Sequence, residues 1–168
     1  MNGWIKALNP TAPITTLEEA RRSARLSVFG ILIGAIIGIV SVTRMMMDHD
    51  SIVAAANAAT AADPTVAGMG GMIAQAMLYF AIGLIVVQLV LALVQWLTPN
   101  IIIPILFTIL IIGGLLTPLM TRPAEALSAP VPHILITVGV AAIQLLLHTA
   151  GIRGASKLDR LRHAETNA

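Results

Sequence analysis

The chain has 168 residues, of which 57% are hydrophobic and 11% are charged, whereas about a quarter of the residues of a soluble domain are charged. A chain of this length cannot hide that much apolar surface in one core and still keep a polar shell, so the composition excludes an ordinary soluble domain and favours a lipid bilayer as the solvent. The absence of cysteine excludes disulfides, thiolate metal sites and cysteine nucleophiles.

The N-terminal region predicts a short membrane-interface segment followed by a helix. Residues 1–15 combine apolar side chains with a lysine and two prolines, a pattern typical of a segment that lies at the bilayer surface. In "TLEEARR", Thr16 and Glu19 have the spacing of a capping box. The helix that begins here is expected to continue without a break into the first apolar stretch.

Uncharged stretches predict four membrane spans. The 18 residues between Arg25 and Arg44 are uncharged, and as a helix they cover about 27 Å, close to the hydrocarbon thickness of a bilayer. The stretch from Pro64 to Thr121 also has no charge, and "LTPN" divides it in two because Pro99 cannot continue a helix. A fourth apolar stretch follows "SAPVP". The predicted spans cover approximately residues 24–44, 72–97, 101–120 and 131–151.

The parts outside the spans are short. The outer loop, residues 45–71, contains the alanine-rich stretch "SIVAAANAATAA", which favours a short helix that begins at Asp50 or Ser51 and ends before Pro64. The tail, residues 152–168, can prolong the last helix. No part is long enough for a separate domain, so residues 1–168 are expected to form one transmembrane domain.

The basic residues indicate the orientation. Eight of the ten basic residues precede the first span or follow the fourth, and an even number of spans places both ends on one side. The positive-inside rule assigns that side to the cytoplasm, so the formal charge of +2 reflects topology and no nucleic-acid partner is expected. A cleaved signal peptide is the alternative interpretation of the first span, but the apolar run is long and the small residues come late. The prediction is an all-α membrane protein, an antiparallel bundle of four transmembrane helices with both termini cytoplasmic, in a bacterial inner membrane.

The first span carries a stripe of small residues. At about 100° per residue the stripe occupies an arc of about 80° along the whole helix, the kind of face that lets helix backbones approach closely in lipid. Three partners remain open for it: another helix of the same chain, a second copy or another membrane subunit, and a lipid or substrate. The stripe consists of Ser27, Gly30, Gly34, Gly38 and Ser41.

Polar side chains form seams on the second and fourth spans. The second span has a small or amide residue at every seventh position. The polar residues of the fourth span fall within an arc of about 80° around Ala141. Unsatisfied amides in hydrocarbon cost several kcal/mol, so we expect the two seams to face each other or a shared interior. The polar seam residues are Gln88, Gln95, His133, Thr137, Gln144 and His148.

The seams have two interpretations. One is a polar path for protons or a small solute, with His148 as the titrating group. The other is interhelical hydrogen bonding that specifies the packing. No Asp, Glu, Lys or Arg lies in the middle of a span, which argues against an ion-coupled transporter built around a membrane carboxylate.

Metal and cofactor sites have little support. His133 and His148 are about 22 Å apart along one helix and cannot ligate the same iron, so no haem and no other cofactor is expected. A cluster at the outer end of the first span combines thioether, carboxylate and imidazole groups, and its soft Met and His ligands suit copper, but a solvated, acidic helix end is the favoured explanation. This weak candidate metal cluster consists of Met45, Met46, Met47, Asp48, His49 and Asp50.

No catalytic motif occurs: the chain lacks a P-loop, HExxH and GxSxG. We therefore expect a small non-enzymatic membrane protein, a homo-oligomer or an accessory subunit of a membrane assembly. The alternatives are a small channel or transporter lined by the seams of the second and fourth spans, and an outer-face metal-binding protein.

Overall fold

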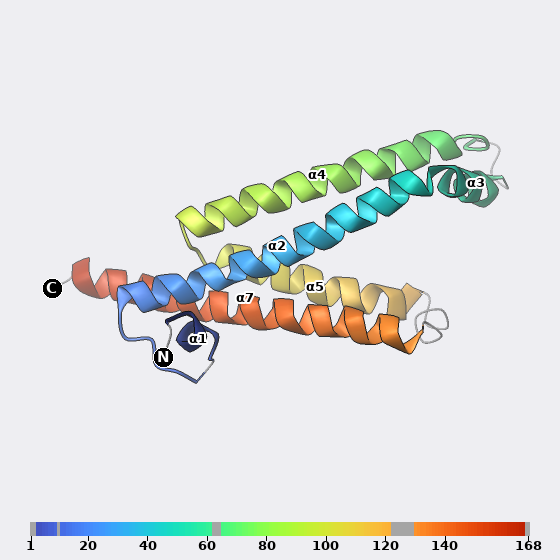
Figure 1. The fold of residues 1–168 in the computed structure, drawn as a ribbon. Coiled ribbons are helices and arrows are strands. Elements are labelled where there is room, and N and C mark those ends of the chain that lie inside the picture. The colour runs from blue at the N-terminus through green and yellow to red at the C-terminus, as the bar shows by residue number, and fades with distance from the viewer. Residues whose placement is uncertain (1–2, 10, 62–64, 122–129, 167–168) are drawn as a thin grey trace. The chain divides into compact units, whose positions relative to one another are not determined.

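The computed structural model describes residues 3–9, 11–61, 65–121 and 130–166, which are mostly helical and include no strand. Four of the helices are long and apolar enough to cross a membrane, so the prediction of an all-helical, multi-pass membrane protein is confirmed by length and composition. The helices are α1 (Gly3–Leu8), α2 (Leu17–Met47), α3 (His49–Thr60), α4 (Gly70–Leu97), α5 (Ile102–Thr121) and α7 (Val131–Thr166), shown in chain order in Figure 1.

Helix α2 begins with the predicted cap, in a modified form. The backbone N–H of Glu19 donates to the hydroxyl of Thr16 at 3.2 Å, as a capping box requires. The Glu19 carboxylate, however, accepts from the N–H and hydroxyl of Thr15, at 2.9 and 3.0 Å, and not from Thr16. From this start α2 continues without a break to Met47.

The predicted division of the long uncharged stretch is confirmed. Helix α4 ends at Leu97 and α5 begins at Ile102. The side chain of Asn100 caps α5 by accepting from the N–H of Ile103 at 3.0 Å. In the loop of residues 45–71, α3 begins at His49, just before the predicted start, and at the other end of the chain α7 continues to Thr166.

The chain forms two compact units, one of Met1–Ile33 with Leu91–Ala168 and one of Gly34–Val90. In the first unit, α5 and α7 run side by side in opposite directions (Figure 1). One apolar cluster joins the N-terminal half of α2 to α5 and the end of α4, and consists of Val28, Ile31, Ala92, Ile103 and Phe107. A second joins α1, α2 and α7, and consists of Ala7, Leu26, Leu147 and Ala150.

Small residues allow α2 and α7 to lie in close contact in the first unit. A Cβ atom placed on Gly151 would lie 2.6 Å from the Cβ of Ser27, and one placed on Gly154 would overlap the backbone nitrogen of Ala24. The hydroxyl of Ser23 donates to the carbonyl of Ala150 at 3.0 Å. Backbone approach of this kind is the usual basis of helix association in lipid.

In the second unit, α2 contacts α4, and α3 contacts the start of α4. At the start of α4, the N–H of Gly70 donates to the side-chain oxygen of Asn57 in α3 at 2.8 Å. A Cβ placed on Gly38 would lie 3.0 Å from the Cγ1 of Ile85, so these positions of α2 and α4 are in contact. Large apolar side chains such as Tyr79 and Phe80 are exposed.

Candidate functional site

His148 is one of two fully buried side chains of the predicted polar seams. Its imidazole is fully buried and stacks on the ring of Phe107, with centroids 5.6 Å apart and planes inclined by 10°. On α2, a Cβ placed on Gly30 would lie 2.9 Å from the Nε2 of His148. Neither ring nitrogen makes a hydrogen bond with any described residue. The imidazole thus occupies an apolar slot formed by α2, α5 and α7.

Gln144 lies one helical turn before His148 and contacts the same point of α2. Its side-chain nitrogen donates to the backbone carbonyl of Gly30 at 3.1 Å. That carbonyl also belongs to the helical ladder, and carbonyl oxygens accept a second hydrogen bond readily because they have two lone pairs. Gln144 therefore ties α7 to α2 within the chain.

Gln95 has a similar role at the end of α4. Its side-chain nitrogen donates to the carbonyls of Ala24 and Asn100, at 3.2 and 3.1 Å, and its oxygen accepts from the N–H of Asn100 at 3.2 Å. Its side chain is fully buried. Next to it, Arg25 donates to the carbonyl of Trp96 at 3.0 Å and lies 4.7 Å from the centre of the Trp96 ring.

The other predicted seam residues lie elsewhere. His133 and Thr137, at the start of α7, are exposed. Gln88 belongs to the second unit, is half-buried, and makes no side-chain hydrogen bond with any described residue. The structure therefore brings Gln95, Gln144 and His148 together against α2 and leaves the remaining three seam residues out of this contact.

The small-residue stripe is divided between the two units. Ser27 and Gly30 are buried in the first unit, and the hydroxyl of Ser27 donates to the carbonyl of Ala24 at 3.0 Å. Gly34 and Gly38 are half-buried in the second unit, and Ser41 is exposed. The N-terminal part of the stripe is thus occupied by α7 of the same chain.

The candidate metal cluster at Met45, Met46, Met47, Asp48, His49 and Asp50 spans the junction of α2 and α3. Met46 and Met47 are exposed, and the backbone carbonyl of Asp48 accepts from the hydroxyl of Ser51 at 2.7 Å. Within residues 3–9, 11–61, 65–121 and 130–166, no three His, Asp or Glu side chains gather closely enough to hold a metal ion.

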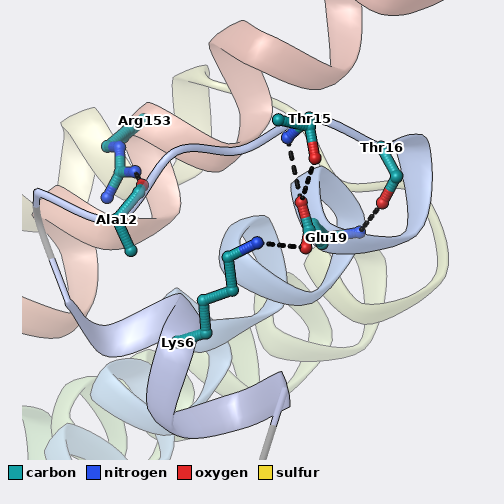
Figure 2. Close-up of polar contacts among 6 residues, drawn as sticks. All are labelled: Lys6, Ala12, Thr15, Thr16, Glu19 and Arg153. Atoms are coloured by element: carbon teal, nitrogen blue, oxygen red, sulfur yellow. Dashed lines mark hydrogen bonds and ion pairs between the residues drawn. The ribbon is translucent and has the colours of Figure 1, made fainter. Parts of the chain in front are cut away.

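The N-terminal residues form a folded structure that the sequence did not predict. Lys6 pairs with the Glu19 carboxylate, which also accepts from Thr15 (Figure 2). The hydrogen bonds from Lys6 and Thr15 lower the pKa of Glu19, which precedes the first apolar stretch, to about 2. In the sequence, the prolines and the capping pair of Thr16 and Glu19 are the features that indicate structure here. Neither of them identifies Lys6 as the partner of Glu19.

Arg153 of α7 holds the segment that follows α1. Its guanidinium donates to the carbonyl of Asn9 at 2.8 Å and to the carbonyl of Ala12, beside which it is drawn in Figure 2. A cavity of about 400 Å³ lies between this segment and α7. Its lining consists of Pro13, Ile14, Arg153, Ser156, Lys157 and Arg160.

Comparison with known proteins gives no relative: no protein-family model, curated protein or solved structure matches the chain. A function for this chain is therefore inferred from the chemistry and contacts of its own residues.

Proposed function

We propose that the protein is a non-catalytic subunit of a membrane assembly, either a homo-oligomer or an accessory subunit. The proposed setting is a bacterial inner membrane, crossed four times by an antiparallel bundle with both termini in the cytoplasm. The observation that carries the proposal is Gln88, a polar side chain in an apolar helix that makes no hydrogen bond with any described residue.

Gln88 lies on the covered face of α4 within the second unit: its side-chain oxygen is buried, and Ile85, about one turn earlier on the same face, contacts Gly38 of α2. The neighbours Val86, Val87 and Leu89, on the other faces of the helix, are exposed. An amide without a partner in hydrocarbon is costly, and glutamine side chains bind across helix interfaces in membranes. In an assembly, a shift in the packing of α4 would let the Gln88 oxygen accept a hydrogen bond from the same amide of a second copy or from a polar group of another subunit.

The other amides support a packing role over a conducting one. Gln95 and Gln144 both donate to backbone carbonyls of α2, so their polar groups are used in joining helices. His148, with two free ring nitrogens, is the observation that favours the second candidate, a small channel or transporter. Proton or solute flux into liposomes tests that candidate: it predicts that His148→Leu abolishes the flux and that Gln144→Leu reduces it.

The oligomeric state of Gln88→Leu tests the subunit proposal. The full chain is purified in a mild detergent, and its mass is measured by light scattering together with any co-purifying subunits. Loss of self-association or of a partner in Gln88→Leu supports the proposal, and the neighbouring Val87→Leu serves as the control. A wild-type protein that is monomeric and free of partners in detergent and in nanodiscs contradicts it.

The topology has a separate test because the natural chain has no cysteine. Single cysteines at Thr11, Ser51 and Thr166 are labelled with a membrane-impermeant maleimide in intact cells and in inverted vesicles. The proposal requires labelling of Ser51→Cys in intact cells, and of the other two only in inverted vesicles. The reverse pattern, or labelling of Thr11→Cys and Ser51→Cys on the same side, overturns it.

A further inference from the structure

The cavity between the N-terminal segment and α7 has the composition of a site for an anion. Arg153, Lys157 and Arg160 line it together with Ser156. The spacing of these four residues, at i, i+3, i+4 and i+7, places them on one face of a helix. Pro13 and Ile14 form the facing apolar side of the cavity. A cavity of about 400 Å³ is within the usual size range of small-ligand sites.

Among the described residues, no carboxylate forms an ion pair with these cations. Arg153 donates to two backbone carbonyls, and the side chains of Lys157 and Arg160 form no ion pair or hydrogen bond with any part of the chain that the structure describes. Three described acidic residues of the same unit have other partners: Glu18 pairs with Arg22, Glu19 with Lys6, and Asp159 with His163. A fourth, Glu165, forms no ion pair with Lys157 or Arg160. The hydroxyl of Ser156 is also without a partner among the described residues. The cavity therefore offers uncompensated positive charge and a free hydroxyl.

The apolar side of the cavity is held in place before a ligand arrives. Arg153 binds the carbonyls of Asn9 and Ala12, immediately before Pro13, and the Glu19 carboxylate binds Thr15 immediately after Ile14 (Figure 2). Both ends of the short segment are thus fixed, one to α7 and one to the start of α2. Such preorganisation lowers the entropic cost of binding.

The position of the cavity along α7 indicates which kind of anion it binds. Arg153 is the first Asp, Glu, Lys or Arg of α7, after a stretch from Val131 to Ile152 without any of these residues. The cavity therefore begins where an apolar span gives way to the headgroup region. Basic pockets at this depth on the cytoplasmic side of membrane proteins suit the phosphates of anionic lipids. The apolar side chains of Pro13 and Ile14 suit the glycerol and the first methylenes of a lipid better than a hydrated ion.

We infer that this cavity binds the phosphate of an anionic glycerophospholipid, with Lys157, Arg160 and Ser156 as the phosphate-binding groups. Arg153 acts mainly as a positioning residue, because its donors are engaged with the N-terminal segment. A second cavity of about 420 Å³, on the α5 side of α7, is lined by Arg160 and Arg162 but also by the acidic residue Asp159. Its mixed charge makes it less suited to a phosphate.

A binding experiment on the full chain in neutral detergent tests this inference. Short-chain phosphatidylglycerol, short-chain phosphatidylcholine and inorganic phosphate are each titrated, and binding is followed by calorimetry. We expect saturable binding of phosphatidylglycerol, with phosphatidylcholine and inorganic phosphate at least tenfold weaker. Equal affinity for inorganic phosphate overturns the lipid assignment in favour of a soluble ligand. Equal affinity for the two lipids overturns the anion site.

Matched variants separate a specific pocket from a general attraction to positive charge. Lys157→Gln is expected to weaken binding about fivefold, and the double variant with Arg160→Gln about 25-fold, if each cation contributes as a basic residue near an anionic surface does. The control is Arg21→Gln with Arg162→Gln, which removes the same charge from two exposed side chains outside this cavity. Equal weakening in the control and the double variant contradicts the inference.

The variants are chosen so that a change in binding is not caused by a loss of folding. Arg153 is left unchanged in every variant because it holds the N-terminal segment. The substituted side chains of Lys157 and Arg160 make no hydrogen bond within the described residues, so thermal unfolding without lipid should match the wild type. The lipid-induced rise in unfolding temperature then gives a second readout. An unchanged rise in the single Lys157→Gln variant counts against the inference even if the double variant is unstable.

Discussion

Gly30 and His148 are in direct contact across α2 and α7, and the glycine has no room for a side chain. A Cβ atom at position 30 would lie 2.9 Å from Nε2 and 3.2 Å from Cε1 of the imidazole. The ring cannot retreat easily, because Phe107 stacks on it at a centroid distance of 5.6 Å. A glycine of the small-residue stripe and a histidine of the polar seam are thus two sides of one helix contact.

Gly30→Ala is expected to lower the free energy of unfolding by about 1–3 kcal/mol, the usual cost of overpacking a filled core. Thermal or denaturant unfolding in detergent measures this. Gly139→Ala on α7 is the control, because a Cβ there meets nothing within 4 Å. Combining Gly30→Ala with His148→Ala should restore part of the loss. If Gly30→Ala is as stable as the control, the imidazole does not occupy the position described.

Gly154→Val is expected to be more severe than Gly30→Ala. The added atoms at position 154 would meet the backbone of α2 at Ala24 and Ser23, and a backbone cannot move aside as a side-chain tip can. We expect the variant to lose its single symmetric peak on size-exclusion chromatography. We also expect it to lose its cooperative transition in thermal unfolding. Gly113→Val in α5 is the matched control, since a Cβ at Gly113 has no neighbour within 4 Å. Similar behaviour of the two variants would refute the close α2–α7 approach.

Gln95→Leu removes two hydrogen bonds at the turn between α4 and α5 and a third to the carbonyl of Ala24 in α2. The loss should be about 1–3 kcal/mol, because the N–H of Asn100 loses its partner in a half-buried place. Unfolding in detergent provides the measurement. Gln75→Leu is the control, since the side chain of Gln75 makes no hydrogen bond with a described residue. Equal stability of the two variants would show that Gln95 does not hold the turn.

The N-terminal segment should loosen in acid. The pKa of Glu19 is lowered to about 2 from an ordinary value of 4.5 by its hydrogen bonds to Lys6 and Thr15. A lowered pKa in the folded state means that the carboxylate stabilises the fold above about pH 4.5 and that this contribution is lost progressively as the pH falls toward about 2. The contribution is small, because the Glu19 side chain is 29% exposed and surface pairs are screened.

The fluorescence of Trp4, whose ring centroid lies 6.0 Å from that of Phe29, reports this loosening. The measurement uses a Trp96→Phe background, in which Trp4 is the single tryptophan. We expect a change in emission between about pH 4.5 and 2 that is reduced in Glu19→Gln. A transition of the same size in Glu19→Gln would assign the acid sensitivity to another group.

Much of the helical framework could be predicted from the sequence. Charge-free stretches and one Thr-Pro-Asn turn are local signals, and they gave the four long helices and the junction at Pro99. The same local reading assigned Arg153, Lys157 and Arg160 only to membrane topology. Their place around a cavity depends on Pro13 and Ile14, which are far away in the chain and reach α7 only because Arg153 binds the carbonyls before them.

The sequence by itself indicated that the apolar stretches lie in a lipid bilayer, because the cost of placing charge in lipid depends mainly on composition. It also indicated the helices, because helical hydrogen bonds are local. Only the tertiary structure decided the partners. Ser27 and Gly30 contact α7 of the same chain, Gln95 and Gln144 bind carbonyls of α2, and Gln88 has no partner among the described residues. A periodic pattern specifies which face of a helix is small or polar, but many helix pairings satisfy the same pattern. The choice among them depends on side-chain contacts between residues that are distant in the chain.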